Sequence, residues 1–302
     1  MFKLAMAVSI ASAVTTTAIA ETFPPETLTA GFKVGESSCK SRSDAVWVVV
    51  DGAGDCIRYY AGGLASGANG AAVIYLHGDR LWGDKPIAYG DNSSQTQQAN
   101  AEAFSKEIGL PFILVARPGT YGSSGNHGQR REVRELRLVS AAIAEIRKRH
   151  RIGKTGLTGQ SGGGAVAAYV LTQQPDLSCV ALTSAALSMN TIVRLDPQSI
   201  YDRASSSLYN AINHVSEVKP NKDRSIFVIW SEGDKFSPPA NQKEYAQALV
   251  ASGRDVHVLQ GEATGSFNHT LDKTGRFAAS WCLNGVPPAE VEKRVLSREV
   301  KG

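Results

Sequence analysis

The segment 159–163 reads GQSGG and places Ser161 among glycines. Residues 155–158 before it are typical of a short strand, and the small residues after it are typical of a helix. On so sharp a strand-to-helix turn, a serine hydroxyl is exposed beside the free N–H groups of the helix N-terminus. Side chains at Gly159 and Gly163 would collide with the neighbouring strand or helix. We therefore predict that Ser161 is a nucleophile; the alternative is a glycine-rich loop that matches the pattern by chance.

A serine nucleophile needs a base, and the sequence offers six histidines. His269 lies in the loop after the last expected strand, at the same carboxyl edge of a sheet as Ser161. We predict His269 as the base, against the alternative of an ordinary loop or helix-capping histidine. The other candidates lie within a strand, within a charged helix, or in loops from which they could join the site: His257, His150, and the pair His127 and His214.

An acid that orients the base is the third requirement. Asp234 follows the apolar run 225–230 (SIFVIW), which places a carboxylate at the same edge of the sheet. Glu232 is a close rival, because an alternating strand pattern does not fix which side chain turns inward, and Asp196 is a weaker one. The remaining alternative for Asp234 is a turn-forming aspartate without a catalytic role.

An oxyanion hole needs two N–H donors next to the nucleophile. We expect the first from Gly162 and the second from the turn after the apolar run AAVIYL, where Gly78 allows the backbone to approach closely. The second donor is then the N–H of Asp79 or Arg80. His77 is expected to hold this turn through a ring hydrogen bond. The alternative is a plain turn after a strand.

Strands and helices alternate from residue 71 onward, which predicts a mostly parallel, twisted sheet of about eight strands with helices on both faces. An antiparallel hairpin is expected at one edge, and residues 21–43 are expected to be irregular. The expected strands are 45–50, 56–61, 71–76, 111–115, 155–158, 180–184, 225–230 and 255–259. The expected helices are 98–108, 131–151, the segment after Ser161 to Gln174, 240–252, 271–282 and 289–297.

Two long connections are expected to build the binding site, because long loops at the carboxyl edge of a sheet commonly do so. One connection covers residues 79–96. The other contains residues 187–224, which we expect to form a short cap insertion. No linker marks a second domain, so we expect residues 21–302 to form a single domain.

Composition excludes several classes of function. The 302 residues carry a net charge of +4 without a polybasic block, so we expect no nucleic-acid partner. The cysteines and histidines lack the spacing of a zinc site, and the predicted chemistry requires neither a metal nor an organic cofactor. No stretch after residue 20 is long and apolar enough for a transmembrane helix, so we expect no stable membrane insertion.

Residues 1–20 are typical of a secretory signal peptide. Lys3 supplies the positive start, residues 4–14 are apolar, and residues 18–20 (AIA) form a small-residue cleavage site before Glu21. The apolar part is too short to span a bilayer, so removal is favoured over anchoring. We therefore expect an exported protein, in a periplasm or outside the cell.

Export changes the interpretation of the four cysteines, because an even number in an oxidising compartment suggests disulfides. Cys39 and Cys56 lie close together around the first strands. Cys179 is expected at the start of a strand and Cys282 near the end of a helix that descends to the same lower edge of the sheet. We favour the pairs Cys39–Cys56 and Cys179–Cys282; buried free thiols are the alternative.

Taken together, several motifs resemble the α/β-hydrolase superfamily over roughly residues 73–282. The G-x-S-x-G-G form and the stretch 214–239 are similar to its dienelactone-hydrolase and prolyl-oligopeptidase-like branches. This resemblance implies a Ser161–Asp234–His269 triad and hydrolysis of an ester, thioester or peptide bond. The motifs are YLHGD at 75–79, RPGTYGSSG at 117–125, GQSGG at 159–163, GD at 233–234 and NH at 268–269.

From these observations we expect an exported serine hydrolase that cleaves a carboxylic ester or thioester through an acyl-enzyme. A peptidase acting on short peptides is the runner-up; an acyltransferase and a non-catalytic binding protein on the same fold are further alternatives. Gln160, Trp82 and Tyr121 are expected to contact the substrate. The polar character of residues 79–96 argues against a long-chain lipid substrate. The sequence leaves the oligomeric state open.

Overall fold

The structure is a computed structural model that describes residues 21–90, 92–195 and 208–302. The expected signal peptide, residues 1–20, lies outside the described residues. So do the rival acid Asp196 and residues 196–207 of the expected cap.

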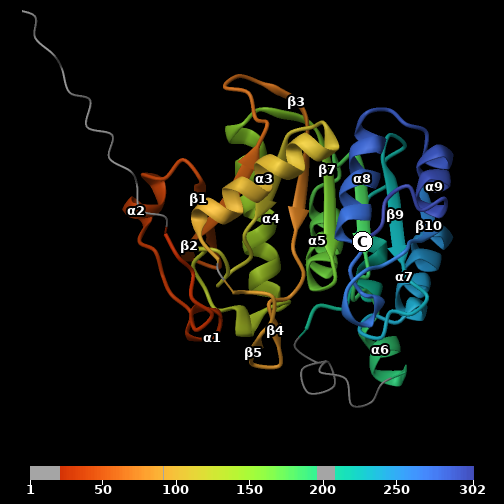
Figure 1. Ribbon diagram of the computed structural model, residues 1–302, viewed down its shortest axis with the longest axis horizontal. Helices are drawn as coiled ribbons and strands as arrows, with labels where there is room; N and C mark the ends of the chain where they lie inside the picture. The colour runs from red at the N-terminus through yellow and green to blue at the C-terminus, as the bar shows by residue number, and fades with distance from the viewer. Residues whose placement is uncertain (1–20, 91, 196–207) are drawn as a thin grey trace, which may run out of the picture.

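An eight-stranded sheet forms the centre of the described chain (Figure 1). In spatial order its strands are β1 (Ala45–Val50), β2 (Ala53–Gly62), β6 (Phe112–Val115), β3 (Asn69–Leu76), β7 (Ile152–Gln160), β8 (Cys179–Thr183), β9 (Ser225–Trp230) and β10 (Val256–Gln260). β2 is antiparallel to both β1 and β6, and every other neighbouring pair is parallel. The predicted sheet, with its hairpin at one edge, is confirmed.

The register of the parallel strands brings the candidate site together. β7 lies between β3 and β8, with Gly159 opposite Leu76 and Gln160 opposite Thr183. β9 continues the sheet on the far side of β8, with Ile229 opposite Thr183. Parallel neighbours end at the same edge of a sheet, so the loops that follow β3, β7, β9 and β10 converge there.

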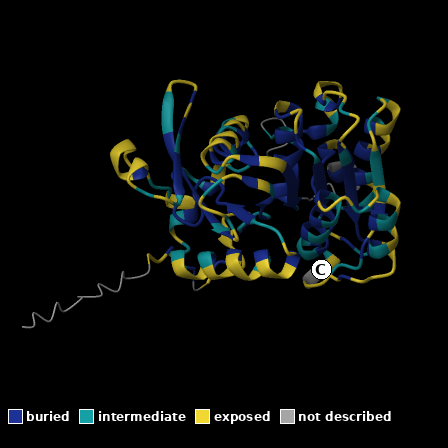
Figure 2. Ribbon diagram, turned by 90° about the horizontal axis from the view of Figure 1, so that it is seen from above, coloured by how far each residue is buried: buried dark blue, intermediate teal, exposed yellow. Residues whose placement is uncertain are grey.

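Helices cover both faces of the sheet (Figure 1). One face is covered by α3 (Ser94–Ile108), α8 (Asp272–Leu283) and α9 (Pro288–Leu296); the other by α4 (Val133–Arg149), α5 (Gly162–Gln173) and α7 (Pro239–Ala251). The apolar side chains form one core on each face of the sheet. Figure 2 shows the buried residues in the strands and the exposed residues on the outer sides of the helices. None of the helices in the described ranges is long and apolar enough to cross a membrane.

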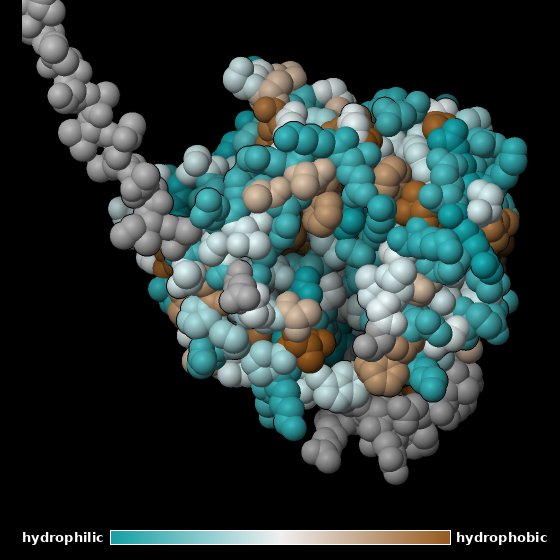
Figure 3. All heavy atoms as spheres, in the orientation of Figure 1, coloured by the Kyte–Doolittle hydropathy of each residue, from teal (hydrophilic) through white to brown (hydrophobic). Residues whose placement is uncertain are grey.

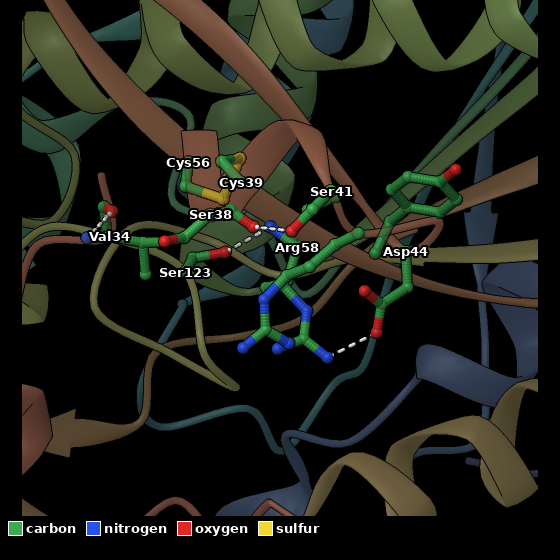
Figure 4. Close-up of a disulfide and its surroundings, with 12 residues drawn as sticks. Val34, Ser38, Cys39, Ser41, Asp44, Cys56, Arg58 and Ser123 are labelled. Carbon is green, nitrogen blue, oxygen red and sulfur yellow. Dashed lines mark hydrogen bonds and ion pairs between the residues drawn. A yellow bond between two sulfur atoms is a disulfide. The ribbon is translucent and has the colours of Figure 1, made fainter. Parts of the chain in front are cut away.

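The segment before the sheet contains two short helices, α1 (Thr27–Ala30) and α2 (Glu36–Lys40), where the sequence predicted irregular structure. A disulfide joins Cys39 in α2 to Cys56 in β2 (Figure 4). Beside it, the buried guanidinium of Arg58 pairs with Asp44, and it lies 2.8 Å from a carboxylate oxygen of Glu21. Covalent and ionic links therefore hold this segment against the edge of the sheet.

A second disulfide joins Cys179 at the start of β8 to Cys282 in α8, with Cα atoms 6.1 Å apart. The two pairs are those favoured from the sequence. Cys179 and Cys282 are separated by 103 residues, and the enclosed segment contains both Asp234 and His269. The bond thus closes a covalent loop around two of the three candidate catalytic residues.

Both long connections contain short elements. The connection after β3 forms a small hairpin, β4 (Leu81–Trp82) and β5 (Lys85–Pro86), which the sequence analysis did not predict. The connection between β8 and β9 contains the helix α6 (Met189–Leu195) and the 3-10 helix η3 (Ala211–Glu217). Two further 3-10 helices are η1 (His127–Gln129) and η4 (Ser266–Asn268).

Candidate active site

Ser161 lies on the turn between β7 and α5 with φ 56° and ψ −124°, a strained conformation for a residue with a side chain. The glycines around it are required by close packing. A Cβ atom on Gly159 would lie 2.4 Å from the carbonyl oxygen of Gly163. One on Gly163 would lie 2.3 Å from the carbonyl oxygen of Leu76. The turn therefore has the geometry that the sequence predicted for a nucleophile.

The ring of His269 is hydrogen-bonded to the carboxylate of Asp234, with Nδ1 2.9 Å from Oδ1 and 3.0 Å from Oδ2. Asp234 is buried, and its Oδ1 also accepts the N–H groups of Phe236 and Ser237 at 3.0 and 2.8 Å. These bonds fix the carboxylate, and the carboxylate fixes the ring. Glu232, the rival acid, is exposed and does not contact His269. The structure thus brings Asp234, and not Glu232, to the imidazole.

Ser161 and His269 line one cavity of about 250 Å³. Other lining residues are Gly78, Arg80, Leu81, Trp82, Gln160 and Phe236. The described hydrogen bonds include none between the Ser161 hydroxyl and the His269 ring. In enzymes without bound substrate this contact is often long and tightens only when substrate binds. The cavity brings a strained serine and an oriented imidazole to the same space.

Two backbone N–H groups next to Ser161 are unpaired in the described part of the chain, those of Gly162 and Asp79. A Cβ atom on Gly78 would lie 3.3 Å from the Cβ of Ser161, so this turn lies directly against the candidate nucleophile. The N–H of Arg80 instead donates to Nε2 of His127 at 3.0 Å. The prediction of Arg80 as an alternative oxyanion donor is therefore wrong, because this N–H is already engaged. Gly162 and Asp79 are left as the candidate donors.

The side chain of Asp79 anchors the turn in a cluster of arginines. Its carboxylate lies 2.8 Å from Nη1 of Arg117, 3.3 Å from Nε of Arg130 and 3.2 Å from Nε of Arg131. Burial alone would raise the pKa of Asp79, but these positive charges lower it far below its usual range. Arg117 also binds Glu135 in α4, with Nε 2.7 Å from Oε1. The cluster therefore fixes the turn to the helix behind it.

Two buried histidines support the same turn without facing the cavity. Nδ1 of His77 lies 2.7 Å from the carbonyl oxygen of Gly78, and Nε2 lies 3.1 Å from the Thr120 hydroxyl, as expected for a structural role. Burial lowers the pKa of His77 and of His127 well below the ordinary value. Both rings are therefore neutral near pH 7, which lets His127 accept the N–H of Arg80.

The remaining histidines do not line this cavity in the described residues. His150 contacts the Tyr59 hydroxyl at 2.8 Å, and His214 lies 2.7 Å from the carboxylate of Glu217. His257 lies 3.2 Å from Asp255. His269 is the histidine that shares the cavity with Ser161.

Gln160 lines the cavity, but both ends of its amide bind protein groups. Nε2 donates to the carbonyl oxygen of His269 at 2.6 Å. Oε1 accepts from the N–H of Leu271 at 3.1 Å and from the Thr183 hydroxyl at 2.9 Å. Substrate contact by Gln160 stays a prediction, and the structure adds a positioning role, because the amide clamps the loop that carries the imidazole.

Tyr121, a second expected substrate contact, does not line the cavity. Its side chain is buried against the ring of Tyr89, with centroids 5.2 Å apart, and it hydrogen-bonds the side chain of Arg80. The prediction for Tyr121 is therefore wrong: the residue supports a lining side chain instead of lining the cavity itself.

Trp82, the third expected contact, lines the cavity and begins a row of aromatic rings. The ring of Phe236 lies 4.7 Å from Trp82, 4.5 Å from Phe267 and 5.2 Å from His269, between centroids. Figure 3 shows a mostly hydrophilic face with hydrophobic side chains around a hollow below its centre. Phe236 and Phe267 were not predicted as site residues, although they follow Asp234 and precede His269 by two residues each.

Part of the chain matches a known protein family. The sequence profile of the prolyl oligopeptidase family matches residues 130–273, which contain Ser161, Asp234 and His269. A search of curated proteins finds no significant match.

Solved structures share the fold at low sequence identity. An esterase from Pyrococcus furiosus is 13% identical, with a TM-score of 0.53 over 89% of this chain and 96% of that chain. An acylaminoacyl peptidase from Pyrococcus horikoshii is 15% identical, with a TM-score of 0.52 over 87% of this chain and 44% of that chain. A puromycin hydrolase is 14% identical, with a TM-score of 0.57 over 80% and 39%. This chain therefore spans less than half the length of the latter two.

Proposed function

We propose that the chain, which has the α/β-hydrolase fold, is a serine hydrolase of the prolyl oligopeptidase family and hydrolyses carboxylic esters or thioesters through Ser161, His269 and Asp234. The observation that supports this proposal most directly is the hydrogen bond between His269 and Asp234. His269 lines the same cavity as Ser161, which lies on a strained turn.

In the proposed reaction His269 acts through Nε2, because Nδ1 is bound to Asp234. Nε2 takes the proton of Ser161 as the hydroxyl oxygen attacks the carbonyl carbon. The negative charge on the carbonyl oxygen is stabilised by the N–H groups of Gly162 and Asp79. His269 then protonates the leaving alcohol or thiol, which departs as the acyl-enzyme forms. A water molecule, deprotonated by the same ring, releases the acid.

We place an ester ahead of a peptide as the substrate because of the size of the chain. The alignment covers 96% of the Pyrococcus furiosus esterase, but only 44% of the acylaminoacyl peptidase. A peptidase acting on short peptides is the second candidate, because the matching profile is that of the prolyl oligopeptidase family.

The test combines covalent labelling with a choice of substrates. We expect a fluorophosphonate probe to label the wild type and Ser252→Ala, whose hydroxyl donates to Leu249 at the end of α7, but not Ser161→Ala. We expect turnover of p-nitrophenyl acetate by the same two proteins. Turnover of aminoacyl-nitroanilides alone would establish the peptidase instead. A folded protein with neither labelling nor turnover would be a binding protein on this fold.

We also propose that the protein is exported, as residues 1–20 and the two disulfides support. The test is osmotic-shock fractionation of expressing cells followed by N-terminal sequencing. We expect a periplasmic or secreted protein that begins at Glu21. A cytoplasmic protein that retains residues 1–20 would contradict this proposal.

A further inference from the structure

The cavity that contains Ser161 and His269 also contains a positive charge that the proposed reaction does not use. Arg80 lines this cavity. Its side chain hydrogen-bonds Tyr121, and Cζ lies 5.7 Å from the centre of that ring. Its Nε atom is buried and has no hydrogen-bond partner within the described ranges. The guanidinium is thus held in place while part of its donor capacity remains unused.

No carboxylate of the described residues forms an ion pair with Arg80. The neighbouring Asp79 is shared among the arginines of the cluster behind the turn. Asp272, which lines the same cavity, pairs with Arg276 at 2.5 Å. Each acid near Arg80 therefore has another arginine as its ion-pair partner, and Arg80 is left without an ion pair among the described residues.

Burying a charged group without an ion-pair partner is costly, so a partly buried guanidinium with an unused donor in this cavity is stabilised by an anionic partner. Arginine presents a planar fork of N–H donors that fits a carboxylate with two parallel hydrogen bonds. The remaining wall is largely apolar, formed by Leu81, Trp82, Ile87 and Phe236. The lining thus combines the Arg80 guanidinium and an apolar surface with two carboxylates, Asp79 and Asp272, that are paired with other arginines.

We propose that Arg80 binds a carboxylate of the substrate, so that the preferred ester carries a negative charge close to the bond that is cleaved. This inference rests on the proposed hydrolase function. Arg80 follows Gly78, which packs against Ser161, by only two residues. The carboxylate therefore lies a few bonds from the scissile carbonyl, on either the acyl side or the leaving-group side.

Two pairs of esters test whether the carboxylate that Arg80 binds lies on the acyl side or on the leaving-group side of the ester. On the acyl side, mono-p-nitrophenyl glutarate is compared with its methyl-capped form. On the leaving-group side, 4-acetoxybenzoate is compared with its methyl ester. We expect the wild type to favour the anionic member of at least one pair in kcat/KM. Arg80→Gln should lower kcat/KM for that anionic ester by roughly 10- to 100-fold and leave the neutral ester nearly unchanged. Arg80→Lys keeps the charge but not the planar fork of donors. Its kcat/KM for the anionic ester should lie between the values of the wild type and of Arg80→Gln.

Arg137→Gln is the matched control, because Arg137 is exposed and pairs with Asp51 on the surface. This variant loses the same charge and should keep the wild-type preference. The inference is overturned if the wild type favours the neutral member of both pairs. It is also overturned if Arg80→Gln and Arg137→Gln behave alike.

A binding measurement separates this inference from the proposed function. Calorimetry with glutarate and with benzoate should detect binding of at least one of them to the wild type and to Arg137→Gln, but not to Arg80→Gln. Absence of ester turnover and of fluorophosphonate labelling would reject the hydrolase proposal, and the calorimetry would still decide whether Arg80 holds a carboxylate. If Arg80→Gln does not fold, the wild-type preference and binding of these acids decide the question.

Discussion

At the scale of single residues, the candidate site depends on the hydrogen bonds that hold the carboxylate of Asp234 in place. The carboxylate accepts two backbone N–H groups and the Nδ1–H of His269. It is also buried, so water does not compete for these positions. An acid held in this way selects one tautomer of the imidazole and leaves Nε2 available as the base of the proposed reaction.

The substitution Asp234→Asn tests whether the carboxylate orients the His269 ring. The amide can donate to Nδ1 and so favours the wrong tautomer, and we expect kcat on p-nitrophenyl acetate to fall by about 10⁴-fold. Glu232→Gln is the control, since Glu232 is the exposed rival two residues away. Steady-state kinetics of both variants provide the measurement. A comparable loss in Glu232→Gln would mean that the acid is assigned to the wrong residue.

At the scale of elements, the site depends on the contact between the end of β7 and the loop that precedes α8. Gln160 spans this contact with hydrogen bonds to the backbone of His269 and Leu271 and to the Thr183 hydroxyl. These groups come from segments far apart in the sequence. The position of the imidazole relative to Ser161 is therefore set in part by one amide.

We expect Gln160→Leu to slow labelling of Ser161 by fluorophosphonate and to lower kcat, with a smaller change in KM, because the His269 loop loses its clamp. Loss of the hydrogen bonds should also reduce the free energy of unfolding by about 1–3 kcal/mol. Gln174→Leu is a matched control, because this buried amide binds Ser140 away from the cavity. If both variants slow labelling equally, Gln160 acts through general stability and not through position.

Strands such as β3, β6 and β9 were predictable from the sequence because they contain short apolar runs, which are typical of strands buried in a sheet. The hairpin of β4 and β5 was not, since two-residue strands leave no periodicity to detect. The helix α2 is similarly short and is tied to the sheet by Cys39. Local propensity carries little information about such elements, because tertiary contacts determine them.

The placement of Ser161, Asp234 and His269 at one edge of the sheet was predictable, since each follows a strand that ends there. The roles of Gln160, Tyr121 and Arg80 were not. These depend on the direction in which a side chain leaves a turn and on which partners it meets there. Neither is encoded in the spacing of residues along the chain.

At the scale of the whole molecule, the two disulfides stabilise the fold to different extents. A cross-link removes more entropy from the unfolded chain when it closes a longer loop. Cys179–Cys282 spans 103 residues, whereas Cys39–Cys56 spans 17. Replacing the long pair by alanine should lower the free energy of unfolding by about 4–5 kcal/mol, and replacing the short pair by about 3 kcal/mol. Urea denaturation of the two double variants measures the difference; an equal or reversed order would contradict this expectation.

The buried histidines make the free energy of unfolding depend on pH. Burial lowers the pKa of His77 and His127 well below the ordinary value, and that of the partly buried His150 below it. As the pH falls below about 6.5, the unfolded chain takes up protons that the folded protein does not. Stability should therefore be constant above this pH and should fall below it, by up to about 1.4 kcal/mol per pH unit for each such proton.

The measurement is urea denaturation between pH 7.5 and pH 5.5, a range in which carboxylates with an ordinary pKa remain ionised. His127→Gln removes one titrating ring, and its amide oxygen can still accept the N–H of Arg80. We therefore expect the dependence of stability on pH to be shallower in this variant by about one proton. His214→Gln is the control, because His214 is only partly buried and lies against the exposed Glu217. A slope in His127→Gln equal to that of the wild type would mean that His127 takes up its proton in the folded protein, and the hydrogen bond from Arg80 would then be lost on acidification.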